Sequence, residues 1–376
     1  MFSFLSDRVR AGVAGKAALA ALLAAFSFSA CATVQMYGVV SSGLTYKHAK
    51  HGDKTLEVSG EYAGPRWGIR GWESLDNGMT ASFVLEAGFH NDSGRNNSEG
   101  GMFSRECQVA LSGRWGTIGL GRVGALSSGS GSVNWYWDME PFETGYNNAG
   151  TQVSSLNVWE FYSNSVYYIS PLFKGAKFGL LYSFSGRNDD QEDPYWSHRD
   201  HFLNIAMRWD RGAHHALLGL ESDFWSNERN AGEKRTKAGH NVKFDYAWDT
   251  TPALRLYAGG NVFMNQRYMS TKDSWTRFDF DRARTGKGMN GIGLNLGGRY
   301  RIGRTEFLGQ LQFLDGENKG APLGREKDFR RYGVAAGVHY LFGNGTKLYA
   351  IGSYIDGSGL IEGSVATVSM GMRWDF

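Results

Sequence analysis

The chain has 376 residues, enough for one large β-barrel or two globular domains. It carries 40 Lys and Arg against 37 Asp and Glu, and a net charge of +3 gives no reason to expect a nucleic-acid partner. After the N-terminus there is no apolar run of about twenty residues, which excludes a helical membrane protein. A membrane barrel remains compatible with this composition, because half of each of its strands faces water.

Residues 1–32 have the features of a secretory signal peptide. Arg8, Arg10 and Lys16 make the start positive, and the apolar stretch 17–28 is too short to span a membrane. Residues 30–32, Ala-Cys-Ala, fit the small-x-small cleavage pattern. We predict that the signal is cleaved before Thr33 and that residues 33–376 form a single barrel domain.

Cleavage there would remove three positive charges and one negative charge, leaving +1 on the remaining chain. A competing interpretation is a lipoprotein signal with Cys31 acylated, but Phe28 fits such a signal poorly. Cys107 would be the remaining cysteine, so neither a disulfide framework nor a cysteine zinc site is expected.

From residue 34 onward, segments of roughly ten residues alternate between apolar and polar side chains, which is typical of membrane-spanning strands. Short, Gly- or Asn-rich turns and longer polar loops separate them in alternation. We predict strands at 34–47, 61–72, 79–90, 102–112, 117–123, 163–170, 177–185, 200–209, 214–224, 239–248, 253–267, 288–300, 305–314, 330–342, 347–355 and 364–376.

The last of these segments, 364–376, alternates most clearly. Ala366, Val368, Met370, Met372, Trp374 and Phe376 share one face, and small or charged side chains, among them Arg373 and Asp375, share the other. A bilayer outside and water inside explain a charged inner face, whereas an aqueous core does not. An edge strand of a soluble sandwich is the competing interpretation of this segment.

Sixteen strands place both ends of the wall on the same side, where the first and last strands can pair and remove the sheet edge. The fold class predicted is therefore all-β: a 16-stranded antiparallel transmembrane β-barrel. Short periplasmic turns, long extracellular loops and aromatic side chains at strand ends are typical of bacterial outer-membrane barrels. A barrel of this size is too wide for side chains to fill, so we expect a water-filled channel.

Several stretches, in their order and spacing, resemble the general porins of the Gram-negative outer membrane, especially the betaproteobacterial type. They are Val34-Gln-Met-Tyr-Gly-Val-Val40, Arg66-Trp-Gly-Ile-Arg-Gly71 with Leu75-Asp-Asn-Gly78, Phe83-Val-Leu-Glu-Ala-Gly-Phe89, Arg105 with Val109-Ala-Leu-Ser-Gly113, Gly116-Thr-Ile-Gly-Leu-Gly-Arg122, Asn164-Ser-Val-Tyr-Tyr-Ile-Ser-Pro171 and the terminal Phe376. They cover the first half of the chain after residue 33 and its C-terminus.

The resemblance implies a homotrimer whose third loop folds into each lumen. It assigns residues 124–161 to that constriction loop, with Asp138, Glu140 and Glu143 as its acids. It places Arg66 and Arg105 on the facing wall, with Arg122 at another common basic position. Here 160–168, Glu-Phe-Tyr-Ser-Asn-Ser-Val-Tyr-Tyr, lacks the arginine that the family often carries, so a weaker anion preference is expected.

The resemblance further implies passive diffusion of small hydrophilic solutes and ions. Phe376 resembles the signal read by the barrel-assembly machinery during insertion. Lipid and lipopolysaccharide would surround the barrel, and no cofactor or nucleic acid is implied.

Strand alternation tests the basic residues separately. Arg66 and Arg70 lie opposite Trp67 and Ile69, as lumen-facing side chains should. Arg105 and Arg122 fall in phase with outward apolar residues, so each requires a bulge or a position beyond the membrane edge. Further candidates for an inner basic ladder are Lys243, Arg255, Arg299 and Arg331.

Some residues of the sequence are also compatible with other functions. The alternative is a substrate-selective channel with an aromatic binding track made by Trp135, Tyr136, Trp137 and Trp159. The competing interpretation is that these side chains pack the loop onto the barrel wall. The acids Asp189, Asp190, Glu192 and Asp193 fit calcium, or a solvated loop. His48, His51 and Asp53 fit a metal site, or a polar loop. An esterase would need a serine nucleophile beside a histidine such as His214 or His215, and no motif singles one out.

Overall fold

The computed structural model describes residues 33–49, 54–59, 63–96, 101–143, 161–186, 198–226, 234–270, 275–277 and 286–376. The predicted signal peptide, residues 1–32, lies outside them. So do Trp159, His51, Asp53 and the acids 189–193. Among the described residues, no helix is long and apolar enough to cross a membrane.

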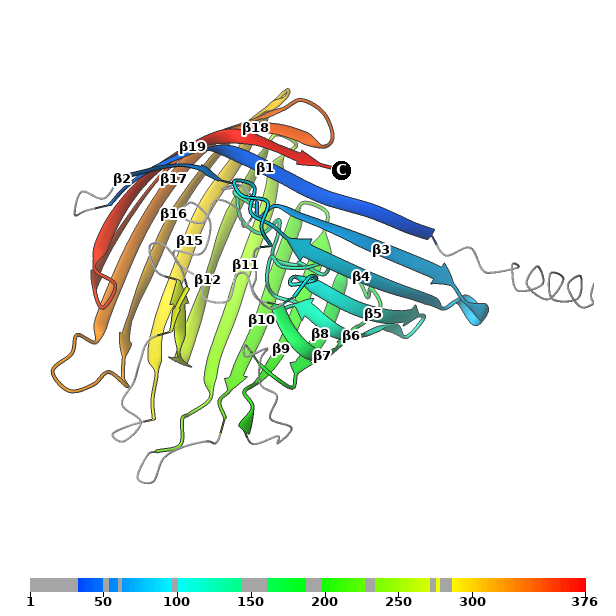
Figure 1. Cartoon of the computed structure of the whole chain (residues 1–376), viewed down its shortest axis with the longest axis horizontal. Coiled ribbons are helices and arrows are strands. Elements are labelled where there is room, and N and C mark those ends of the chain that lie inside the picture. Colours follow the sequence, from blue (N-terminus) through cyan, green and yellow to red (C-terminus); the bar gives the residue numbers. More distant parts are fainter. Residues whose placement is uncertain are drawn as a thin grey trace, which may run out of the picture.

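The described chain is almost entirely strand, and the strands form one closed antiparallel barrel (Figure 1). The wall strands are β1 Thr33–Ala49, β2 Lys54–Ser59, β3 Arg66–Ser74, β4 Thr80–Gly88, β5 Glu106–Gly113, β6 Gly116–Gly124, β7 Phe161–Ile169, β8 Ala176–Ser183, β9 His201–Arg211, β10 His214–Phe224, β11 Gly239–Thr251, β12 Leu254–Gln266, β15 Met289–Ile302, β16 Thr305–Asn318, β17 Asp328–Leu341, β18 Thr346–Gly359 and β19 Gly363–Asp375. A one-turn 3-10 helix, Asp76–Gly78, lies between β3 and β4.

The second wall strand is in two pieces. β2 pairs with Gly43–His48 and β3 pairs with Thr33–Val39, both along the same edge of β1. Counting β2 and β3 together as one gives sixteen wall strands, which confirms the predicted fold class. The prediction of one continuous strand over 61–72 was wrong, because the sheet begins earlier, at Lys54, and again at Arg66.

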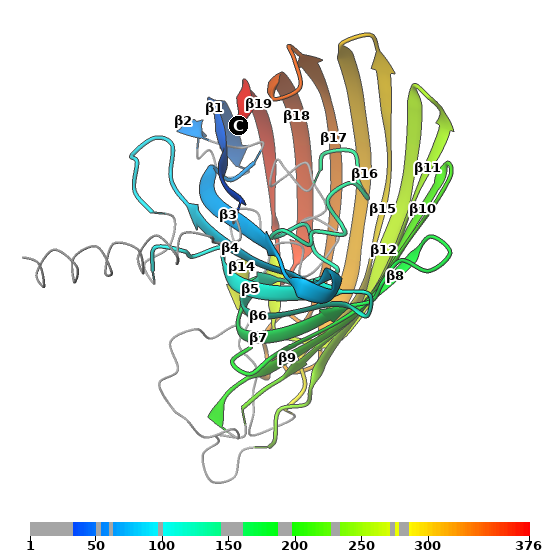
Figure 2. The ribbon, with the colours of Figure 1, turned by 90° about the vertical axis from the view of Figure 1, so that its right-hand side faces the viewer.

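The barrel closes by pairing β1 with β19. The register joins Val39 to Asp375 and continues to the pair formed by Ala49 and Val365. Figure 1 shows the last strand lying beside the first, and Figure 2 shows the curved wall from the side. Closure satisfies the backbone groups of both edges, which a bilayer requires because its core offers no water to them.

The predicted alternation holds along the wall. Outward positions carry large exposed apolar side chains, such as Val368, Met370 and Met372 on β19, whereas the intervening Ser369 and Arg373 are buried. The inner face is therefore polar, in keeping with an aqueous interior and a lipid exterior.

Two connections differ from the sequence-based prediction. The loop expected over 356–363 is shortened to three residues, 360–362, because β18 and β19 extend toward each other. The loop expected over 268–287 contains a small hairpin, β13 Tyr268–Ser270 paired with β14 Trp275–Arg277.

Candidate functional site: a charged zone between the barrel wall and an inner segment

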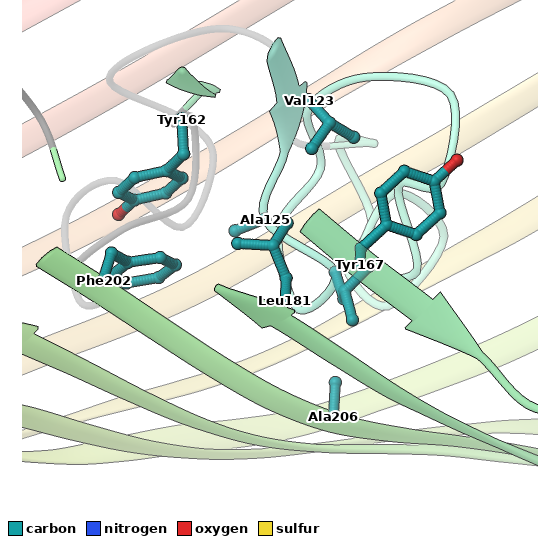
Figure 3. Packing of buried hydrophobic residues seen from close by; sticks show 8 residues of the cluster. Val123, Ala125, Tyr162, Tyr167, Leu181, Phe202 and Ala206 are labelled. Atoms are coloured by element: carbon teal, nitrogen blue, oxygen red, sulfur yellow. The ribbon is translucent and has the colours of Figure 1, made fainter. Parts of the chain in front are cut away.

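The segment 125–143, between β6 and β7, lies against the inner face of the wall. Its first residues pack on inward side chains of β7, β8 and β9, where Ala125 belongs to one buried cluster with Leu181 and Ala206 (Figure 3). In Figure 2 this teal segment lies within the space that the strands enclose. Its apolar side chains thus cover an apolar part of the inner wall, and this packing holds its acids at fixed places.

A buried polar network holds the start of this segment. Ser127 Oγ donates to Glu221 Oε1 at 2.8 Å, and the Ser127 amide donates to Asn204 Oδ1 at 3.2 Å. Lys243 Nζ lies 2.7 Å from the same Glu221 oxygen, and both side chains are almost fully buried. A buried charge pair of this kind is stable only when its hydrogen bonds are satisfied, and Asn241 supplies a further one to Glu221 Oε2.

The acid Asp138 faces two arginines of the wall. Arg208 donates from Nη1 and Nη2 to its two carboxylate oxygens, at 2.8 and 3.0 Å. Arg255 Nη1 lies 3.6 Å from Asp138 Oδ2. The same Arg208 guanidinium also bonds to Asp210, so one cation lies between an acid of the segment and an acid of the wall.

Glu143 lies among three cations that come from the wall strands β15, β18 and β19. Its carboxylate is 3.1 Å from Arg299, 3.2 Å from Lys347 and 3.8 Å from Arg373. The third predicted acid, Glu140, is fully buried, so it presents no charge to solvent at the surface of the segment.

Arg66 at the start of β3 and Arg105 just before β5 share the carboxylate of Glu86 on β4. Arg105 Nε lies 2.6 Å from Glu86 Oε1, and Arg66 Nε lies 3.5 Å from Glu86 Oε2. Tyr37 donates its hydroxyl to Glu86 Oε2 at 3.1 Å. Glu86 therefore offsets part of the positive charge that these two arginines bring to the wall.

Arg70 is exposed, and its guanidinium donates twice to Gln35 Oε1, at 3.2 and 3.1 Å. It also lies over the ring of Tyr37, with 5.2 Å between the guanidinium carbon and the ring centroid. Among the described residues, Arg70 forms no ion pair. Its positive charge is thus less compensated than that of Arg66 or Arg105.

The wall and the inner segment together bound a cavity of about 240 Å³. Its lining residues include Arg66, Arg70, Arg105, Glu86 and Trp137. Three of the four predicted basic residues therefore meet the segment at one place.

The positions of Arg105 and Arg122 resolve their conflict with strand alternation. Arg105 precedes β5, so the alternation of that strand does not set its direction. Arg122 lies at a register shift between β6 and β7, next to Gly121, whose φ is +135°. Arg122 donates to the Ser104 carbonyl and to Ser163 Oγ, both at 2.7 Å.

The aromatic residues of the segment are used mainly for packing. Tyr136 is buried in a cluster with Met139, Leu217 and Tyr257, and Trp135 packs against that cluster. Trp137 faces the cavity and lies under the guanidinium of Arg373, 5.4 Å from its ring centroid. A continuous aromatic track along Trp135, Tyr136 and Trp137 is therefore not present, because two of the three rings are turned into the wall contact.

The C-terminal Phe376 extends the pairing of the last strand, β19, with the first strand, β1. It exchanges backbone hydrogen bonds with Gly38, at 3.0 and 3.1 Å, and its ring covers that glycine. A side chain on Gly38 would collide with the ring, so glycine is needed there for the close approach.

The model of the Gram-negative porin family matches residues 18–360. The chain belongs to the Gram-negative porins. An outer membrane porin protein of Bordetella pertussis is 26% identical over 395 residues, with 95% of this chain and 98% of that protein covered. Outer membrane porin protein 32 of Delftia acidovorans is 30% identical over 211 residues, with 54% and 58% covered.

Solved porins share the fold of this porin. The structure titled as an anion-selective porin from Comamonas acidovorans aligns with a TM-score of 0.67 at 18% identity, covering 92% of this chain and 100% of that one. The predicted family and fold are thus confirmed. The porin is a passive channel of the Gram-negative outer membrane, and such proteins are channels rather than enzymes.

Sequence reasoning missed several partners in this porin. Arg373 was placed on an inner face but given no role, and Glu86, Arg208, Lys347 and Gln35 were not singled out. Strand alternation predicts that all of these side chains point inward, but it does not predict which charged side chains contact one another. Of the predicted basic ladder, Lys243 pairs with Glu221, Arg255 with Asp249 and Asp138, and Arg299 with Glu143.

Within the part of the porin that the structure describes, no group of three His, Cys, Asp or Glu side chains is placed to hold a metal ion. Cys107 is free and exposed on β5. His215 contacts Asp210 and Asp249, at 2.6 and 3.1 Å, within the same charged network as Arg208 and Arg255. This histidine is thus part of the charged wall.

Proposed function

We propose that this porin conducts small hydrophilic solutes and ions through a charged constriction formed by loop 124–161 and the facing wall. The cavity that Arg66, Arg70 and Arg105 share with Trp137 of the loop carries this proposal. Acids on the loop and arginines on the wall produce a transverse field, and the low-dielectric walls strengthen it.

A weak preference for anions follows from the pairing of these charges. Glu86 offsets part of Arg66 and Arg105, whereas Arg70 is exposed and has no ion-pair partner among the described residues. Asp138 and Glu143 are each paired with wall cations, so the acids contribute little free negative charge. The anion selectivity named for the Comamonas acidovorans porin agrees with this sign.

The test is the zero-current potential of the purified porin in a planar bilayer under a salt gradient. Anion preference in the parent and a shift toward cations in Arg66→Ala support the constriction. Cation preference in the parent would keep the channel and assign the dominant charge to the loop acids. A channel without measurable conductance would contradict the open pore.

We further propose that the porin is a homotrimer surrounded by lipid and lipopolysaccharide. The outer face of β3 to β6 supports a contact between copies, because Trp72, Phe83, Val109 and Leu120 line an apolar hollow of about 430 Å³ there. A Vibrio cholerae outer membrane protein solved in a trimer form shares the fold, with a TM-score of 0.57 at 13% identity. Conductance steps in groups of three, with a matching cross-linked mass, test this state.

Residues 1–32 are proposed to be a signal peptide that is removed before Thr33, and Phe376 to be read by the barrel-assembly machinery. The exposed aromatic end of β19, Trp374 and Phe376, supports the second proposal. N-terminal sequencing of the porin from outer membranes tests the first.

A further inference from the structure

Three inward-facing glycines of the wall lie directly beneath the inner segment. They are Gly179 on β8, Gly219 on β10 and Gly297 on β15. The φ angle of none of them is positive, so the backbone conformation there would accept any residue. Glycine weakens a strand, and its presence in a strand commonly marks the close approach of another backbone or side chain.

Each of these glycines makes room for one part of the segment. A Cβ atom on Gly179 would lie 2.5 Å from Leu126 Cδ1 and 2.9 Å from Trp135 Cη2. A Cβ atom on Gly219 would lie 2.7 Å from Ser127 Cβ. On Gly297 it would collide with the ring of Pro141 and lie 2.9 Å from the Gly309 carbonyl oxygen.

Two of the three glycines belong to one depression in the wall. Gly179 is the cross-strand partner of Ala206 on β9, and Ala206 is the partner of Gly219 on β10. Three adjacent strands therefore present no side chain larger than a methyl group at this level. The next partner across the sheet is Lys243, which ends the depression with a long side chain.

Polar contacts fix the segment at these same places. Ser127, which sits over Gly219, bonds to Glu221 and Asn204. Arg299, two residues beyond Gly297 on β15, donates to the carbonyl oxygen of Pro141 at 2.6 Å. The segment is therefore held by hydrogen bonds at positions where the wall has been hollowed to receive it.

We propose that Gly179, Gly219 and Gly297 are positioning residues of the pore: they set how far the inner segment projects into the lumen, and thereby the conductance. This inference rests on the proposed role of the segment as the constriction. A side chain at any of the three would lift the segment from the wall, because a close-packed contact cannot absorb an added methyl group without displacement. Lifting it narrows the lumen.

The experiment measures single-channel conductance of the full-length porin in planar bilayers. Gly179→Ala and Gly219→Ala are the test variants, since the closest contacts of both added methyl groups are with the segment. Gly309→Ala on β16 and Gly352→Ala on β18 are matched controls, because a Cβ atom there has no neighbour within 4 Å. We expect a loss of conductance in the test variants and parental conductance in the controls.

A double-mutant cycle tests whether the loss of conductance in Gly179→Ala comes from its contact with Leu126. Leu126→Ala removes the Cδ1 atom that lies nearest to the new methyl group, so Gly179→Ala with Leu126→Ala should recover part of the conductance, while the 2.9 Å contact with Trp135 remains. If Gly179→Ala does not assemble, Leu126→Phe enlarges the same contact from the loop side and should lower conductance. Parental conductance in both glycine variants would overturn the proposal.

A separate measurement distinguishes this inference from the proposed constriction. Asp138→Cys, in a Cys107→Ser background, places a single accessible thiol on the segment. Block of the current by a bulky thiol reagent shows that the segment borders the ion path. If the reagent blocks the current and the glycine variants keep the parental conductance, the positioning role of the glycines is refuted while the constriction stands. If the reagent does not block the current, the constriction is refuted as well.

Discussion

Arg208 on β9 binds Asp138 of the inner segment through two parallel hydrogen bonds of 2.8 and 3.0 Å. The Arg208 side chain is 10% exposed and that of Asp138 is 45% exposed, so solvent screens this contact in part, and its strength comes from the paired geometry. Because Arg208 also bonds to Asp210, removing it would leave two carboxylates facing each other without their common cation.

Arg208→Ala is therefore expected to loosen the segment and add negative charge to the lumen. The loss of charge-assisted hydrogen bonds is worth about 2 kcal/mol. We expect a lower free energy of unfolding in urea and a zero-current potential shifted toward cations. Arg208→Lys, which keeps the charge without the two-pronged geometry, should retain the potential but lose stability. Equal potentials in Arg208→Ala and the parent would contradict the prediction.

Arg70→Ala is expected to reduce anion preference with little loss of stability, whereas Arg105→Ala should reduce both. Arg70 is exposed and unpaired by acids among the described residues, whereas Arg105 lies 2.6 Å from Glu86. Removal of Arg105 also leaves Glu86 with less compensation, so it should cost stability as well as charge. Reversal potentials under one salt gradient measure the first effect and urea unfolding measures the second, with Arg330→Ala, in an exposed pair with Asp315, as the control.

Lys243→Met is expected to destabilise the barrel by about 3–5 kcal/mol, because it leaves Glu221 buried without its cation. Both side chains are at most 2% exposed. Lys243→Met with Glu221→Gln should recover much of the loss, since neither side chain is then charged. The matched control is Lys319→Met, whose exposed pair with Glu317 should contribute less than about 1 kcal/mol. Urea unfolding in lipid vesicles measures all four free energies.

Phe376→Ala is expected to weaken closure of the barrel and to lower the yield of inserted protein. Its ring covers Gly38, and its backbone bonds to that glycine belong to the main chain and survive the substitution. The loss should therefore come from the ring alone. Fractionation of outer membranes gives the yield, and Phe342→Ala, which removes an exposed aromatic of another strand end, is the control. Equal yields for the two variants would argue against a special role for Phe376.

The strands themselves follow from local pattern. A period of two in segments such as 364–376 places apolar side chains on one face, and only a bilayer outside with water inside accommodates both faces. The even number of such segments allows antiparallel closure of β1 on β19, and the register from Val39 to Ala49 confirms this closure. The same alternation correctly placed Arg66 and Arg70 on the inner side.

Strand alternation could not predict the ion pairs between the inner segment and the wall, because these pairs join residues that are far apart in the sequence. Asp138 and Glu143 were expected to face Arg66 and Arg105, and their ion pairs are instead with Arg208, Arg299 and Lys347. Arg105 and Arg122 broke the alternation, and a strand end and a register shift account for them. The sequence alone therefore determined a sixteen-stranded membrane barrel with a polar interior, since strand period and bilayer solvation act locally. Only the tertiary structure decided which charges compensate one another and where Gly179 and Gly219 receive the segment, because these depend on packing between distant strands and the segment they enclose.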